Sequence, residues 1–184
     1  MDRRNVIIGM AAAGMLPMVT GVAAQDRPIE KTKLKALMGG DFATATSEVA
    51  ATRATSRQVK TFSELEIEEQ AAVARAFGSK PGAAGLSEKH QAALQKLQAA
   101  SGAEFDRMYI DGQINGHEEL LGIHKSYARS GDDPMARGAS MVAVTGIQSH
   151  LVMLKSIKST LSRRKREGHG AAVQPSVAIL TAKQ

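Results

Sequence analysis

The chain has 184 residues, a formal net charge of +6, no cysteine, no tryptophan and only 3% aromatic residues. This length predicts one domain with a sizeable core, and the missing cysteines exclude disulfides, thiolate metal sites and cysteine nucleophiles. Because aromatic residues are few, aliphatic side chains must fill the core, which favours close-packed helices over a sheet. The surplus positive charge lies mainly near the two ends, so we expect no nucleic-acid partner.

Residues 1–24 have the pattern of a signal peptide. Arg3 and Arg4 precede an apolar stretch over residues 6–19, and small residues lead up to Ala24. An uncleaved anchor is the alternative, although this stretch is short and rich in Gly and Ala for a membrane span. The arginine pair is also similar to a twin-arginine signal, so that route and the general secretory route both stay open. We expect an exported protein in the periplasm or associated with the outer envelope.

The next segments predict two helices after a lead-in. Residues 25–40 form this lead-in, with a short helix over residues 31–38 that Gly39 and Gly40 stop. Asp41 is expected to cap a helix that runs to about residue 55. Ser56 is placed to cap the following helix, and Gly78 begins a loop.

Three further helices complete the predicted domain. Ser87 begins a short one, a long one follows from Phe105 to Gly131, and Pro134 stands at the first position of the last, which runs to Leu161. The order predicts an all-α, up-and-down bundle of four main helices with one extra short helix over residues 41–161. Residues 162–184, with a basic run at 163–166, read as a basic flexible tail. This tail is either simply solvated or in peripheral contact with an anionic membrane or envelope polymers.

Polar residues on otherwise apolar helix stripes form the candidate site. Glu66 and Glu69 lie between Phe62 and Val73 at helical spacing, where a bundle normally carries apolar residues. His117 and His150 occupy comparable positions on two other helices. A buried carboxylate is costly unless it is paired or bound to a cation, and imidazole with carboxylate suits iron, zinc or manganese.

The alternative to a metal site is a buried polar cluster without an ion. It would include Gln70, with Tyr109 nearby, while exposure of some members is a further possibility. His90 and His124 are expected at the surface. The Glu-x-x-His pairs of di-iron bundles, a zinc-peptidase histidine pair, a nucleophile elbow and a phosphate loop do not occur. We therefore predict no catalytic residue, and a metal-dependent oxidase is only a minor alternative.

Several segments resemble a bacterial family of exported ferritin-like domains of unknown function, often labelled outer membrane proteins. They are residues 59–63, the stretch Gly-Ala-Glu-Phe-Asp-Arg-Met-Tyr at 102–109, and residues 113, 117, 132–134 and 149–151. The resemblance implies a ferritin-like bundle and no particular activity. Many members carry an Asp-His pair where this chain has Glu69 and Gln70, and a Glu where it has Ala43.

This departure resembles a subgroup with Leu-Glu-x-x-Glu-Gln, here residues 65–70. It leaves His117 and His150 as the shared candidates. The sequence thus predicts an exported, non-enzymatic helical-bundle protein with a buried Glu/His cluster. The alternative is a transition-metal-binding or storage protein that uses Glu66, Glu69, His117 and His150; oligomeric state and cofactor stay open.

Overall fold

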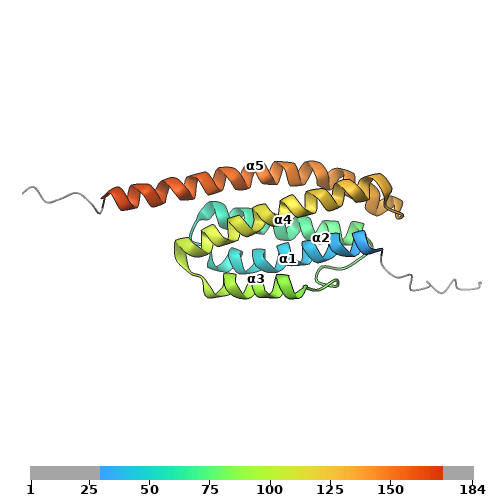
Figure 1. Ribbon diagram of the computed structural model, residues 1–184, viewed down its shortest axis with the longest axis horizontal. Coiled ribbons are helices and arrows are strands. Elements are labelled where there is room, and N and C mark those ends of the chain that lie inside the picture. The colour runs from blue at the N-terminus through green and yellow to red at the C-terminus, as the bar shows by residue number, and fades with distance from the viewer. Residues whose placement is uncertain (1–29, 172–184) are drawn as a thin grey trace, which may run out of the picture.

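The computed structural model describes residues 30–171, and within this range all regular structure is helical. The predicted all-α class is therefore confirmed. The predicted signal peptide and residues 172–184 of the predicted tail lie outside the described residues. Figure 1 shows the five helices, which are α1 (Lys31–Arg53), α2 (Arg57–Ala76), α3 (Glu88–Ala99), α4 (Gly102–Ser130) and α5 (Pro134–Ala171).

Four long helices pack side by side, and the short α3 lies on the opposite side of the molecule from α5 (Figure 1). Short connections at residues 54–56 and 131–133 turn the chain back between α1 and α2 and between α4 and α5. In addition, α1 packs against α4, and α2 packs against α5. The interior between α2, α4 and α5 is where the candidate residues meet.

The glycine pair in α1 does not stop that helix, contrary to the sequence prediction. Gly39 and Gly40 lie in the middle of one continuous helix. A Cβ on Gly39 would come within 2.7 Å of Leu120 in α4, and one on Gly40 within 2.6 Å of the Gln70 amide in α2. The two glycines therefore allow α1 to approach both neighbouring helices closely, and this packing offsets their low helix propensity.

Two buried aspartates tie connecting segments to the helices. Asp41 does not cap a helix as predicted; from within α1 its carboxylate accepts hydrogen bonds from the backbone of Gly82, Ala84 and Gly85 in the α2–α3 loop. Asp106 of α4 accepts bonds from the Thr55 hydroxyl and from the backbone N–H groups of Thr55 and Ser56, immediately before α2. Both carboxylates satisfy backbone donors that would otherwise lack a partner.

Other helix boundaries follow the local signals. Ser87 accepts a hydrogen bond from the His90 N–H at the start of α3, as an N-cap does. Gly78, the residue after the C-cap Phe77 of α2, has φ +68°, a left-handed conformation that favours glycine. Pro134 is the first residue of α5, and the Asp133 carboxylate caps that helix through Met135 N–H and Ala136 N–H.

The buried apolar side chains form two clusters. The main core contains Phe62, Phe105, Tyr109, Ile147 and Leu154 among others. A second, smaller core lies towards the start of α5 and consists of Ala36, Leu37, Ala74, Phe77, Tyr127 and Ala136.

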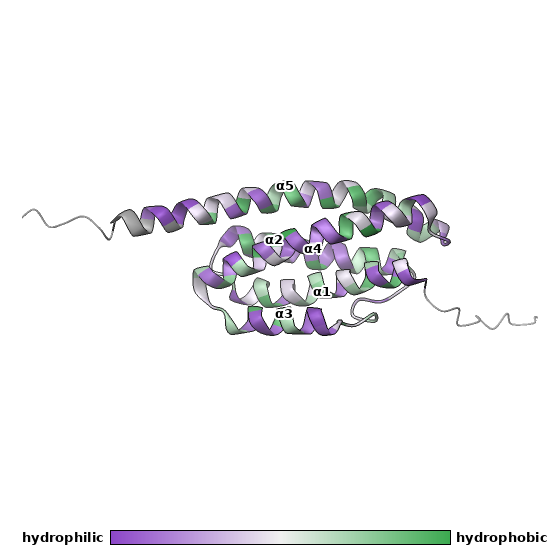
Figure 2. Ribbon diagram, viewed as in Figure 1, coloured by the Kyte–Doolittle hydropathy of each residue, from purple (hydrophilic) through white to green (hydrophobic). Residues whose placement is uncertain are grey.

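The last helix is longer than predicted and is the longest in the described range. It continues past Leu161 to Ala171, so the basic residues Arg163, Arg164 and Arg166 are helical rather than part of an unstructured tail. This end of α5 extends beyond the other helices (Figure 1) and is predominantly hydrophilic (Figure 2). Within residues 30–171, no helix combines the length and the apolar character that a bilayer span requires.

Candidate metal centre

The second helix carries the buried carboxylate of the site. Glu66 is fully buried and lies one turn after Phe62 on the inner side of α2. Gln70, one further turn along, donates from its amide Nε2 to Glu66 Oε1 at 2.9 Å. This bond fixes the carboxylate plane and leaves the second oxygen, Oε2, directed towards α4 and α5.

Two histidines meet this oxygen. His117 of α4 places its Nε2 3.4 Å from Glu66 Oε2, and His150 of α5 places its Nδ1 3.2 Å from the same oxygen. The two ring nitrogens are themselves 3.2 Å apart. Three donor atoms from three helices therefore form a small triangle in the interior, and together they make a group that could hold a metal ion.

Hydrogen bonding fixes which nitrogen of His117 carries a proton. Its Nδ1 is 2.8 Å from the backbone carbonyl oxygen of Gln113, one turn earlier in α4. A carbonyl only accepts, so Nδ1 must donate, and in the neutral ring Nε2 then presents a lone pair to the triangle. A metal-binding histidine is oriented in the same way by an acceptor at its other nitrogen.

The outer nitrogen of His150 faces a second carboxylate. Its Nε2 is 3.2 Å from Glu69 Oε2, and the Glu69 side chain is about one-third exposed. The Glu69 charge favours a proton on Nε2, which leaves Nδ1 as the inner atom. The absence of a side chain at Gly146 provides space here, because a Cβ at that position would lie 3.2 Å from Glu69 Oε1.

The charges of this cluster depend on one another. Burial alone would raise the pKa of Glu66, but the nearby rings of His117 and His150 and the Gln70 amide outweigh it and lower that pKa to about 2. The interaction with Glu66, opposed by burial, raises the pKa of His150, and Glu69 adds to the increase. Without a metal, a proton on His150 Nδ1 can donate to His117 Nε2 and balance the Glu66 charge.

One oxygen of the triangle lacks a hydrogen bond in this arrangement. Glu66 Oε2 is buried and close to both rings, yet neither ring nitrogen is aligned with it for a hydrogen bond. Buried carboxylate oxygens without a hydrogen bond are uncommon in native structures, and a role in binding an ion is one recognised explanation.

Aromatic and polar side chains enclose the triangle. The Phe62 ring packs against both histidines, with ring centroids 6.0 Å from His117 and 5.3 Å from His150. Beyond Phe62, the Tyr109 hydroxyl is hydrogen-bonded to Ser47 Oγ at 2.8 Å, and Gln113 donates to Ser47 and Thr46. Burial, with a smaller contribution from the Glu66 charge, raises the pKa of Tyr109, which therefore stays protonated.

The size of the triangle fits a transition-metal ion. A point equidistant from the three atoms lies about 1.9 Å from each, so an ion slightly out of their plane reaches bond lengths of about 2.0–2.1 Å. Ligands at such bond lengths in a tetrahedron are about 3.3 Å apart, close to the observed separations. Two imidazoles and a carboxylate suit zinc, iron or manganese.

The structure brings together three of the four predicted ligands. Glu66, His117 and His150 converge, whereas Glu69 contacts the outer nitrogen of His150 and lies outside the triangle. The expected neighbours Gln70 and Tyr109 are both close to the cluster.

The prediction of surface positions for two other histidines needs correction. His124 is only 3% exposed, hydrogen-bonded to Ser140 Oγ and packed against Phe77. His90 is partly buried and stacks on Phe42 with ring centroids 4.5 Å apart. The burial of His124 was visible in the sequence, because it continues the inner stripe that runs from His117 through Leu120.

The chain matches the family described as Domain of unknown function (DUF4142) over residues 17–157. It belongs to this family. The matched region contains all three residues of the triangle and ends before the basic part of α5. No curated protein and no solved structure matches the chain.

Proposed function

We propose that this protein is an exported, non-enzymatic bundle of ferritin-like fold that binds one transition-metal ion through Glu66, His117 and His150. The observation that carries the proposal is the convergence of three donor atoms within 3.2–3.4 Å of one another in the interior. In the neutral rings the outer nitrogens hold the protons, so the inner atoms are all electron-pair donors. Three inner electron-pair donors become favourable only when a metal ion or a proton lies among them.

Among the candidate metals, the spacing favours zinc. The separations correspond to a tetrahedral arrangement, which zinc prefers, whereas octahedral ions at similar bond lengths bring neighbouring ligands closer, to about 3.0 Å. Three protein ligands leave a fourth position for water or another small ligand. Glu69 would act on the ion indirectly, by orienting His150.

The remaining parts of the proposal rest on other observations. The signal-peptide pattern in residues 1–24 supports export, and four long helices packed side by side support the ferritin-like assignment. The lack of recognisable catalytic motifs supports a role without catalysis. Binding or storage of the ion is then the function that remains.

A proton is the competing occupant of the triangle. With His150 protonated, the cluster is charge-balanced and would serve only to hold α2, α4 and α5 together. Metal and proton compete for the same three atoms, so the metal content of the purified protein decides between the two functions.

The first prediction concerns metal binding itself. Protein purified from its native compartment, analysed by elemental mass spectrometry, should contain about one equivalent of metal. After chelation it should bind one equivalent of Zn²⁺ by calorimetry. The variants His117→Gln and His150→Gln should each weaken Zn²⁺ binding at least 30-fold, because each removes one of three direct ligands.

Two variants serve as controls for this experiment. His124→Gln removes another buried histidine from α4 without touching the triangle, so its Zn²⁺ affinity should equal that of the unmodified protein. Glu69→Gln should weaken binding only about tenfold, as expected for a residue that orients a ligand. Less than about a tenth of an equivalent of metal together with no binding in calorimetry would leave the charge-balanced cluster as the correct interpretation.

A further inference from the structure

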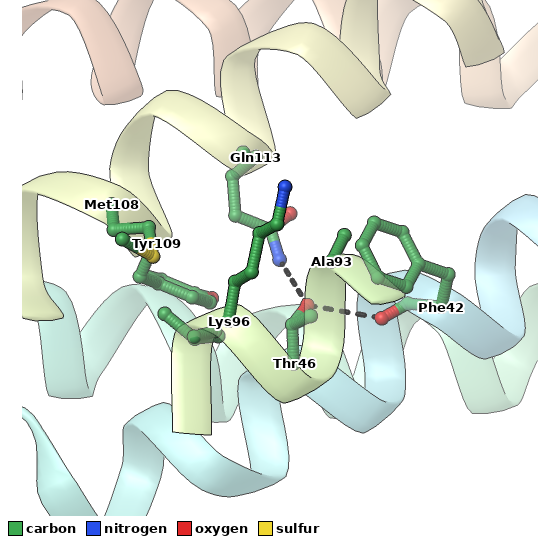
Figure 3. Close-up of a pocket in the computed structure, with 9 residues that line it drawn as sticks. Phe42, Thr46, Ala93, Lys96, Met108, Tyr109 and Gln113 are labelled. Atoms are coloured by element: carbon green, nitrogen blue, oxygen red, sulfur yellow. Dashed lines mark hydrogen bonds between the residues drawn. The ribbon is translucent and has the colours of Figure 1, made fainter. Parts of the chain in front are cut away.

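A separate, partly open cavity of about 240 Å³ is lined by residues of α1, α3 and α4 (Figure 3). Its α3 wall lies on the side of the molecule away from α5 (Figure 1). Three helices contribute to its walls, and most of the lining atoms are carbon. The lining residues are Phe42, Thr46, Ala93, Lys96, Leu97, Met108, Tyr109, Gly112 and Gln113.

The cavity exists because small residues face it. Gly112 of α4 lines the cavity at an exposed position, and a Cβ built there would meet no atom within 4 Å. Ala93 supplies only a methyl group from α3. Stacking of His90 on Phe42 holds one wall in place.

Most polar groups in the walls already have hydrogen-bond partners. Thr46 Oγ1 donates to backbone carbonyls of its own helix and accepts from Gln113 Nε2 at 3.0 Å, as Figure 3 shows. The Tyr109 hydroxyl is hydrogen-bonded to Ser47. Gln113 Oε1 accepts no hydrogen bond from the described residues, but the exposed wall is almost entirely carbon, so the part of a ligand inside it must be largely apolar.

One cation borders the cavity. Lys96 is exposed, extends from α3 in the direction of α4 in Figure 3, and takes part in none of the ion pairs within residues 30–171. Its aliphatic stem lines the wall while its ammonium group stays in contact with water, as long cationic side chains commonly do. A ligand with an anionic end outside an apolar body would pair with it.

We propose that this cavity binds a free medium-chain carboxylate, with a hydrocarbon body of about eight carbons inside and the carboxylate on Lys96. The volume supports this size, because an apolar cavity of about 150 Å³ accommodates benzene and this one is larger. The apolar walls exclude a strongly polar ligand, and the single cation selects an acid over an alcohol of equal length. The proposal does not depend on whether Glu66 and the two histidines hold a metal.

Octanoate and 1-octanol, titrated into ¹⁵N-labelled full-length protein and followed by NMR, test the proposal. Octanoate should bind at one site with a Kd below about 1 mM, shifting the amide resonances of Thr46, Gly112 and Gln113. Lys96→Met should weaken octanoate binding about tenfold and leave octanol binding within twofold. Gly112→Leu should weaken the binding of both at least tenfold, because its side chain fills the cavity.

Gly122→Leu is the matched control, because Gly122 is also an exposed glycine of α4 with free space around it but does not line the cavity. Its octanoate affinity should be unchanged. Ala93→Leu provides a second filling variant if Gly112→Leu does not fold. The proposal is wrong if octanoate causes no saturable shift at the cavity, or if a folded filling variant binds it as tightly as the unmodified protein. Equal octanoate binding by Lys96→Met would overturn the assignment of the carboxylate to Lys96.

Discussion

The imidazole of His124 lies in an apolar environment between α4 and α5, with Ser140 as its hydrogen-bond partner and Phe77 against its ring. Burial lowers its pKa to about 4 from an ordinary value of 6.5. The unfolded chain therefore binds a proton at this residue between about pH 4 and 6.5, whereas the folded protein does not. The free energy of unfolding must fall as the pH drops through that window.

Between pH 7 and pH 5 this histidine should lower the free energy of unfolding by about 2 kcal/mol. In His124→Gln that contribution should be absent, so the stability of the variant should fall less over the same interval. Urea denaturation of both proteins in chelator at the two pH values measures the difference.

The contributions of the other histidines are the same in both proteins, so they cancel in this comparison. His150, with its raised pKa, contributes with the opposite sign, because its proton is held more tightly in the folded state. If the free energy of unfolding falls equally with pH in both proteins, the buried neutral His124 does not contribute to the pH dependence of stability.

The residues of the triangle were largely predictable from the sequence, and their detailed roles were not. Helical spacing placed Glu66, His117 and His150 on inner stripes, and all three are buried and in contact. Glu69 approaches the outer nitrogen of His150. This contact depends on side-chain rotamers and on the space at Gly146. Such details come from tertiary packing, which periodicity does not encode.

Helix ends in this protein are determined partly by residues distant in the sequence. The carboxylate of Asp106, almost fully buried in α4, satisfies three donors of Thr55 and Ser56 before α2. Local capping signals located several helix boundaries correctly. They could not reveal the cap from Asp106, because this residue is distant in the sequence. The same limitation explains why the glycine pair was interpreted as the end of a helix, because its benefit arises from contacts with Gln70 and Leu120.

The cap supplied by Asp106 leads to a stability prediction. Asp106→Ala leaves two backbone N–H groups and a hydroxyl without their acceptor, so the free energy of unfolding should fall by about 3 kcal/mol. Urea denaturation provides the measurement. Asp111 lies in the same helix as Asp106 and forms an exposed ion pair with Lys158 of α5. Asp111→Ala should change the free energy of unfolding by less than about 1 kcal/mol. Similar losses in both variants would contradict a special role for Asp106.

At the scale of the whole molecule, the order of the helices followed from the sequence, because apolar spacing and turn residues recur in each segment. The number did not, because the helices predicted over residues 31–38 and 41–55 are one helix, α1. The length of α5 could not be predicted, since its last ten residues are polar or small and carry no apolar stripe that would indicate a helix. Buried side chains in the described range end at Leu161, so the rest of α5 contributes little to the core.

Removing residues 162–184 should therefore change the free energy of unfolding by less than about 1 kcal/mol. We also propose that the basic end of α5 contacts anionic lipid, so the truncated protein should lose binding to anionic vesicles in a sedimentation assay. A full-length variant with Arg163, Arg164 and Arg166 changed to Gln should show the same loss, since each exposed cation contributes about 1 kcal/mol. Unchanged binding in both proteins would show that this end of the helix has no such role.

The two separate cores have an optical consequence. The chain contains two tyrosines and no tryptophan, and each core holds one of them: Tyr109 in the main core and Tyr127 in the smaller one. Both side chains are about 1% exposed. Tyrosine fluorescence therefore reports the unfolding of each core through the tyrosine that this core contains. In Tyr127→Phe the signal comes from the region next to the metal candidates, and in Tyr109→Phe from the opposite end. Coincident denaturation curves for the two variants would mean that both cores unfold as one cooperative unit.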